Sequence, residues 1–259
     1  MATSLSPVCC NILGVDIYWY GIAYVVGLWF ALYYARRLTM HDERGACVDA
    51  FFSVACVCII VGGRLGHVLF FDWSHYAHHL SDIIRIRDGG MSFHGGLLGV
   101  VLGAVWFCRK HRINFLYFSD IVAMVAPVGL GLGRVANFIN GELYGVPTGV
   151  PWGVIFRNVP GGPRHPTQIY EAIAEGGLTF LVLWVCRRRM LRLSNGANGM
   201  ISTIFLICYG LARFSIDFLK DTTRYNGFTV GQWLSMLMIV IGGCWLCMIK
   251  RRARLSCAG

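Results

Sequence analysis

The chain has 259 residues, of which 56% are hydrophobic and only 14% are charged, and its mean hydropathy is +0.58. A soluble domain carries nearer a quarter of its residues as charged side chains, so this composition argues against a soluble protein. The formal net charge of +10 is typical of nucleic-acid binding only where basic residues share one soluble surface. Here the basic residues flank long apolar runs, so we predict a membrane protein and no nucleic-acid partner.

In chain order, seven apolar stretches are long enough to cross a bilayer core of about 30 Å. Their ranges are 17–35, 48–71, 91–108, 118–140, 171–186, 199–218 and 231–249. We therefore predict an all-α integral membrane protein with seven transmembrane helices. The whole chain, residues 1–259, is expected to form a single polytopic membrane domain with short periplasmic loops or a small head region.

Basic residues set the predicted orientation. The segments that follow the first, third, fifth and seventh stretches hold 14 of the 23 lysine and arginine residues. Cytoplasmic loops carry the excess of Lys and Arg in membrane proteins. The N-terminus is therefore expected on the periplasmic side and the C-terminus in the cytoplasm.

Three arginines fall inside the predicted spans: Arg64, Arg134 and Arg213. An arginine in the hydrocarbon core costs about 2.5–3.5 kcal/mol even on lenient scales, so it normally faces the bundle interior and has a partner. The predicted orientation places all three in the outer half of the membrane. Their common depth is the first indication of a functional site.

Other polar residues are expected at the same depth. They are Tyr20, His94, Asn137, Asn140, Glu142, Glu171, Glu175, Tyr209 and Asp217. Tyr209, Arg213 and Asp217 share one helical stripe, so Asp217 is expected to balance part of the arginine charge. Glu142 joins Asn137 and Asn140 only if the helix unwinds at Gly141. Each residue also has a plain structural interpretation, such as an interfacial tyrosine or a glutamate that neutralises an arginine.

Arginines beside amides in a low-dielectric setting suit an oxyanion, because the guanidinium fork matches phosphate. At membrane depth the obvious phosphate is a phospholipid headgroup. No serine or cysteine at this depth resembles an activated nucleophile, so the attacking group is a second substrate or water. Four histidines in "HVLFFDWSHYAHH" (67–79) lack a second ligand cluster, and we predict no metal site. The residues alone predict an enzyme that acts on phospholipids at an outward-facing site. They do not identify the group that accepts the transferred part of the lipid.

Seven motifs follow one another along the chain: "YWYGIAY", "GGRLGHVLFF", "MSFHGGLLG", "GRVANFINGELYG", "HPTQIYEA", "YGLARF" and "GQWLSM". They resemble, in the same order, motifs of the prolipoprotein diacylglyceryl transferases, a family of bacterial inner-membrane enzymes. One such motif would be weak evidence, whereas seven in order are specific. They extend over almost the whole chain.

The resemblance implies a reaction in which the diacylglyceryl group of phosphatidylglycerol passes to the lipobox cysteine of a prolipoprotein. A thioether forms and glycerol phosphate leaves, which is the first step of lipoprotein maturation, and no cofactor is implied. The residues it marks as catalytic are His94, Arg213 and Tyr20. Those it marks as binding phosphatidylglycerol are Arg134, Asn137, Asn140, Glu142 and Gly145. From their positions in the spans we add Arg64, Tyr209 and Glu171 to the lipid-binding set.

The chain departs from the family pattern after the sixth span, where Asp217 and Lys220 stand in place of the usual Glu and Arg. A lysine keeps the charge but loses the guanidinium fork. Two other functions are open to the residues alone: a seven-helix transporter of an anion or lipid, and a phospholipid headgroup hydrolase. Transport is disfavoured because the inner halves of the spans are mostly apolar.

Overall fold

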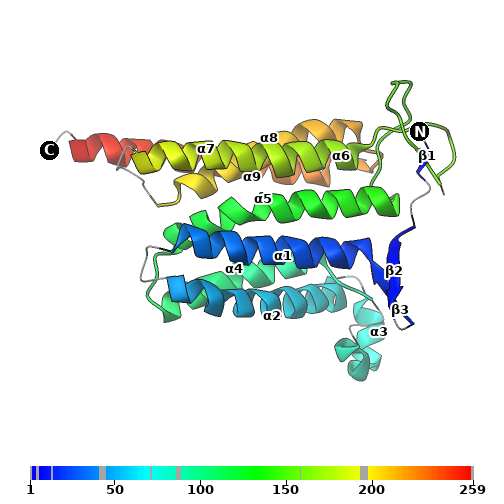
Figure 1. The fold of residues 1–259 in the computed structure, drawn as a ribbon, viewed down its shortest axis with the longest axis horizontal. Helices are drawn as coiled ribbons and strands as arrows, with labels where there is room; N and C mark the ends of the chain where they lie inside the picture. Colours follow the sequence, from blue (N-terminus) through cyan, green and yellow to red (C-terminus); the bar gives the residue numbers. More distant parts are fainter. Residues whose placement is uncertain are drawn as a thin grey trace. The chain divides into compact units, whose positions relative to one another are not determined.

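The computed structural model describes residues 2–3, 6–12, 14–40, 45–70, 72–85, 89–157, 159–192 and 198–257. The described chain is mostly helical (Figure 1). It divides into two compact units, the first made of residues 1–35 and 119–259, and the second of residues 36–118.

The first unit holds most of the long helices. They are α1 (Trp19–Leu38), α5 (Phe115–Asn140), α6 (Thr167–Glu171), α7 (Thr179–Arg192), α8 (Met200–Ile216) and α9 (Val230–Cys257). A π-helical segment, η3 (Ala172–Leu178), joins α6 to α7, and a short 3₁₀ turn, η4 (Asp217–Leu219), follows α8. Figure 1 shows α7, α8 and α9 side by side, and the end of α5, the start of α6 and the end of α8 reach the same end of this unit.

Short strands accompany this end of the first unit. They are β1 (Ala2–Thr3), β2 (Val8–Ile12), β3 (Val15–Tyr18), β4 (Ile155–Phe156), β5 (Arg224–Tyr225) and β6 (Phe228–Thr229). β1 pairs in parallel with β4, whereas β2–β3 and β5–β6 are antiparallel. These small sheets tie the residues before α1 and the loop after α5 to the helix ends.

The second unit contains α2 (Gly45–Phe70), α3 (Trp73–His78), the 3₁₀ turn η1 (Leu80–Ile84) and α4 (Phe93–Lys110). Glycines let α2 and α4 approach closely. A Cβ added at Gly62 would lie 3.0 Å from the Cα of Gly99, and one at Gly95 would lie 2.8 Å from the Cα of Gly66. Small residues at four-residue spacing pack transmembrane helices in this way.

Helices occupy all seven predicted apolar stretches. Most of their ends agree within a few residues, but α7 continues to Arg192 and α9 to Cys257, beyond the predicted ends at 186 and 249. Five described segments are long and apolar enough to cross a membrane: Cys47–Phe70, Phe115–Asn140, Thr167–Met190, Met200–Leu219 and Val230–Arg251. α1 and α4 occupy the other two stretches. α1 is rich in tyrosine and tryptophan, and α4 has four glycines and ends in two basic residues, which lowers the mean hydropathy of both helices.

Local chemistry explains where two of the helices begin and end. α5 ends at Asn140 because Gly141 takes a φ of +71° and Leu143 a φ of +61°. At the start of α8, the carboxylate of Asp120 on α5 accepts hydrogen bonds from the backbone N–H groups of Gly199 (2.8 Å) and Ser202 (2.7 Å). A side chain of one helix thus caps the free N–H groups of another.

Candidate functional site

A cluster of six charged side chains occupies the first unit where α5, α6, η3 and α8 meet. Its members are Arg134, Glu171, Glu175, Arg213, Asp217 and Lys220. The two glutamates are fully buried, and the side chains of Arg134 and Arg213 are 16% and 19% exposed. With every group ionised, the three cations and three carboxylates balance to zero formal charge. A buried cluster of this kind is tolerated only because each charge has a partner.

The two arginines share the same pair of carboxylates. Nε of Arg134 lies 3.3 Å from one oxygen of Glu171 and 3.3 Å from one oxygen of Glu175. Nη1 of Arg213 contacts Glu171 closely and lies 3.5 Å from Glu175. The guanidinium groups of α5 and α8 therefore converge on one place. Both are neutralised by this shared pair of acids, and Arg213 has Asp217 as a further acidic neighbour.

Lys220 and Asp217 extend the cluster toward the end of the helices. Nζ of Lys220 lies 2.7 Å from Glu171 and 3.9 Å from Asp217, and Nε of Arg213 lies 3.5 Å from Asp217. Thr229 donates a hydrogen bond of 2.6 Å to the other oxygen of Asp217. Burial and the nearby Arg213 lower the pKa of the Lys220 ammonium from its ordinary value, while Glu171 acts in the opposite direction.

Several guanidinium donors of the cluster make no hydrogen bond to the residues of this unit that the structure describes. The hydrogen bond of Arg134 to Glu175 is made by Nε, and neither of its Nη groups is hydrogen-bonded to the described residues of this unit. Arg213 bonds through Nη1, and its Nη2 forms no hydrogen bond with those residues. The glutamates thus hold one part of each guanidinium, and three amino groups are left for an acceptor that has several oxygens.

A second network joins the predicted tyrosine and amides. Nδ2 of Asn137 donates to the hydroxyl of Tyr20 (3.1 Å) and to Oε1 of Glu142 (3.0 Å), and Nδ2 of Asn140 donates to the same carboxylate oxygen (3.2 Å). The prediction that Glu142 joins these amides if the helix unwinds at Gly141 is confirmed. Oδ1 of Asn140 is buried and has no hydrogen-bond partner in the described chain.

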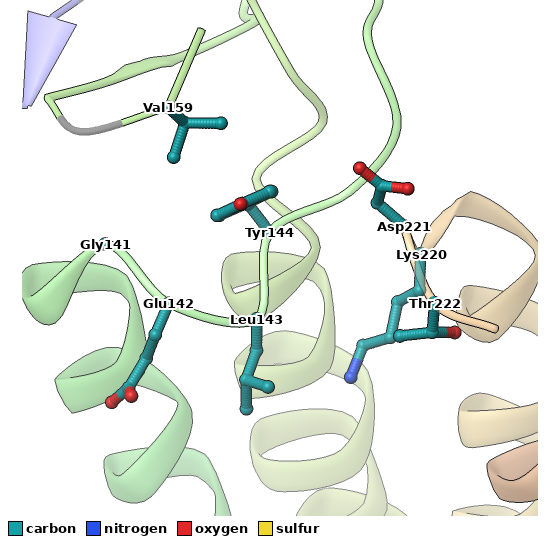
Figure 2. Close-up of a pocket in the computed structure, with 8 residues that line it drawn as sticks. All are labelled: Gly141, Glu142, Leu143, Tyr144, Val159, Lys220, Asp221 and Thr222. Atoms are coloured by element: carbon teal, nitrogen blue, oxygen red, sulfur yellow. The ribbon is translucent and has the colours of Figure 1, made fainter.

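An open pocket of about 440 Å³ adjoins both networks (Figure 2). It is lined by Gly141, Glu142, Leu143, Tyr144, Val159, Lys220, Asp221 and Thr222. Figure 2 shows Glu142 and Lys220 on opposite sides of it. Because Lys220 also contacts Glu171, the pocket is connected to the charged cluster through one side chain.

Gly145 lies just beyond this pocket, in a tightly packed segment that forms an antiparallel bridge with Lys220. Its N–H donates to the carbonyl of His165 (2.9 Å), and its carbonyl accepts from Arg164 (3.2 Å). A Cβ at this position would lie 2.8 Å from His165 and from Thr167. The packing alone therefore requires glycine here, whatever part Gly145 plays toward a lipid.

Two predicted site residues belong to the second unit. His94 is exposed in the first turn of α4, where Ser92 caps the helix by accepting from the N–H of Gly95. Arg64 is 4% exposed on α2, and its guanidinium donates to backbone carbonyls of its own unit. Their predicted roles in catalysis and lipid binding stay predictions.

The first unit brings the other predicted residues into two adjoining groups. Tyr20, Asn137, Asn140 and Glu142 form the amide network. Arg134, Glu171 and Arg213 form the centre of the charged cluster, and Tyr209 lies within electrostatic reach of it. The residues predicted to act in catalysis or lipid binding did not include Glu175 and Lys220, although Glu175 was expected at the same depth and lies on one helical face with Glu171. The expected balance of Arg213 by Asp217 is confirmed.

These features define a class: a helical integral membrane protein with a buried arginine–glutamate cluster at one end of its helices. Comparison with known proteins narrows this class to one family. A family model described as prolipoprotein diacylglyceryl transferase matches residues 7–248. The chain belongs to this family.

Curated relatives agree over nearly their full lengths, and each carries the name phosphatidylglycerol–prolipoprotein diacylglyceryl transferase. The chain is 41% identical to the protein of Geobacter sulfurreducens, with 96% of both chains covered. It is 41% identical to that of Rickettsia akari, covering 94% of this chain and 96% of the relative. It is 40% identical to that of Mesorhizobium japonicum, covering 93% and 89%.

Proposed function

We propose that this protein transfers the diacylglyceryl group of phosphatidylglycerol to the thiol of the lipobox cysteine in a prolipoprotein. Family membership and the names of the relatives support the reaction. The observation that carries the proposal is the set of donors on Arg134 and Arg213 to which the described part of the first unit offers no acceptor. Two guanidinium groups that are fixed on the same glutamates, with three amino groups to spare, are suited to one lipid phosphate.

In the proposed reaction the thiol sulfur forms a bond to the glyceryl carbon, and the bond from that carbon to the phosphate oxygen breaks. Negative charge builds on the departing glycerol phosphate, and Arg134 and Arg213 stabilise it. Buried donors are effective here because they are already oriented and the local dielectric is low. The thiol proton passes to His94, directly or through water, since thiolate is the reactive form.

The amide network has a positioning role in this proposal. Asn137 fixes the hydroxyl of Tyr20, and Glu142 holds both amides on one side. The Tyr20 hydroxyl is proposed to orient the glyceryl group. Tyr209, within electrostatic reach of Arg213, is proposed to contact the lipid headgroup.

The proposal includes a membrane arrangement. All seven helical stretches span the bacterial inner membrane as one domain, with the N-terminus in the periplasm, the C-terminus in the cytoplasm and the site toward the periplasmic leaflet. The alternating lysine and arginine content of the connecting segments supports this orientation. The substrates are then phosphatidylglycerol in the outer half of the bilayer and the signal peptide of a prolipoprotein.

The test uses purified protein in phosphatidylglycerol nanodiscs with a synthetic lipobox peptide. We expect the peptide to gain one diacylglyceryl group by mass spectrometry, with an equal amount of glycerol phosphate released. A matched peptide with serine in place of cysteine should release none. Release of glycerol phosphate without peptide would indicate a hydrolase, and peptide-independent movement of an anion across vesicles would indicate a transporter. Either result would overturn the proposed transfer.

A further inference from the structure

Arg64 uses all of its donors within its own unit. A guanidinium has five N–H groups, and the structure gives them five backbone carbonyls. Nε donates to Ile83 (2.7 Å), Nη1 to Gly89 (2.6 Å) and Gly90 (3.1 Å), and Nη2 to Asp82 (2.6 Å) and Arg85 (3.1 Å). The ring of Tyr76 covers the guanidinium, with its centroid 5.1 Å from Cζ.

We propose that Arg64 is a positioning residue that sets the start of α4, and with it His94, and that it is not a ligand of the lipid phosphate. A phosphate would have to displace several carbonyls from a side chain that is only 4% exposed. The displaced carbonyls would then lose the donors that the buried guanidinium now gives them, which is costly. Arg64 therefore differs from Arg134, whose Nη groups are not engaged by its own unit.

The contacts connect Arg64 to α4 in short steps. The carbonyls of Gly89 and Gly90 bind Nη1, and the N–H of Ser92, two residues further on, donates to the carbonyl of Gly63 (2.9 Å). Ser92 is the N-cap of α4, and His94 is the second residue of that helix. Arg64 and Gly63 thus fix the chain immediately before the helix that carries the histidine.

Gly90 shows how closely this segment is held. Its φ is +78°, and a Cβ there would lie 2.8 Å from Nη1 of Arg64 and 2.7 Å from the ring of His67. A side chain at this position would push the carbonyls away from the guanidinium. Gly90→Ala is therefore a second way to loosen the same anchor without changing the charge of Arg64.

The experiment compares Arg64→Lys and Gly90→Ala with the wild-type protein in nanodiscs. A lysine has three donors on one nitrogen and does not satisfy five carbonyls. We expect cleavage by trypsin after the exposed Arg85 to become several-fold faster in both variants. We also expect kcat to fall by about 10- to 100-fold, as for a misplaced catalytic group, while KM for phosphatidylglycerol changes less than about two-fold. Arg189→Lys, at an exposed position on α7, is the control and should change neither quantity.

The catalytic part of this inference rests on the proposed function of His94, whereas the cleavage assay needs no activity. If the wild-type protein is inactive, the proposed function is wrong. The proteolysis result still decides whether Arg64 holds the chain before α4 in place. If Arg64→Lys raises KM for the lipid with kcat and cleavage unchanged, Arg64 is a headgroup ligand and the inference is wrong. Unchanged cleavage in both variants would also overturn it.

Discussion

Arg134→Lys separates charge from geometry at the centre of the cluster. In the wild-type protein, Nε of Arg134 holds the two glutamates while both Nη groups are available to a ligand. A lysine has one nitrogen, which stays with the glutamates or turns to the phosphate, but does not do both. The variant keeps the charge balance and should lose at least one charge-assisted hydrogen bond to the phosphate. Such a bond is worth about 1.5–3 kcal/mol, which corresponds to a fall in kcat/KM of about 10- to 160-fold.

The assay is peptide-dependent release of glycerol phosphate at limiting phosphatidylglycerol. Arg189→Lys controls for the substitution itself, and thermal unfolding of each variant shows whether the fold is retained. The reasoning holds that Nε of Arg134 binds the glutamates while its Nη groups bind the phosphate. It would be refuted if folded Arg134→Lys protein kept a kcat/KM within about two-fold of wild type.

Three further predictions concern stability and follow from the packing. Glu171→Gln leaves three cations facing two carboxylates, so the free energy of unfolding should fall by about 3–5 kcal/mol. A fall below about 1 kcal/mol, measured by thermal unfolding, would contradict this. Asp120→Asn weakens the cap of α8 and should cost about 0.5–2 kcal/mol with kcat unchanged, and an altered kcat in folded protein would argue against a purely structural role. Gly95→Ala places a Cβ 2.8 Å from the Cα of Gly66 and should lower the free energy of unfolding by about 1–3 kcal/mol. Gly177→Ala is the control and should not lower the melting temperature, because its Cβ would meet no atom within 4 Å outside its own stretch of helix. Equal melting temperatures for the two glycine variants would exclude the close approach of α2 and α4.

The helices and much of the site follow from local patterns in the sequence. Hydrophobic length marks the stretches, because lipid allows no other way to satisfy the backbone. The glycines at four-residue spacing on α2 and α4 are visible in the sequence, and they allow the close approach that the structure shows. The turn at Gly141 that brings Glu142 to the asparagines was also foreseeable, because a glycine after a helical run often ends the helix.

Partners that are distant in the sequence were harder to predict. Arg64, Arg134 and Arg213 all lie in predicted spans, yet one binds five carbonyls and the other two share glutamates. Nothing in the residues around Arg64 indicates that residues 82–85 and 89–90 supply the carbonyls that it binds. The π-helical segment from Ala172 was likewise unexpected, since its hydrophobic pattern is that of an ordinary helix. These features depend on tertiary packing and not on local propensity.

The most direct test of a shared phosphate site is a solid-state NMR measurement. Protein labelled with ¹⁵N at arginine would be placed in phosphatidylglycerol bilayers, and the dipolar coupling between guanidinium nitrogens and the lipid ³¹P would be recorded. We predict a coupling that weakens in both Arg134→Lys and Arg213→Lys and persists in Arg64→Lys. A coupling that is unchanged in the first two variants, or lost only in the third, would contradict the account.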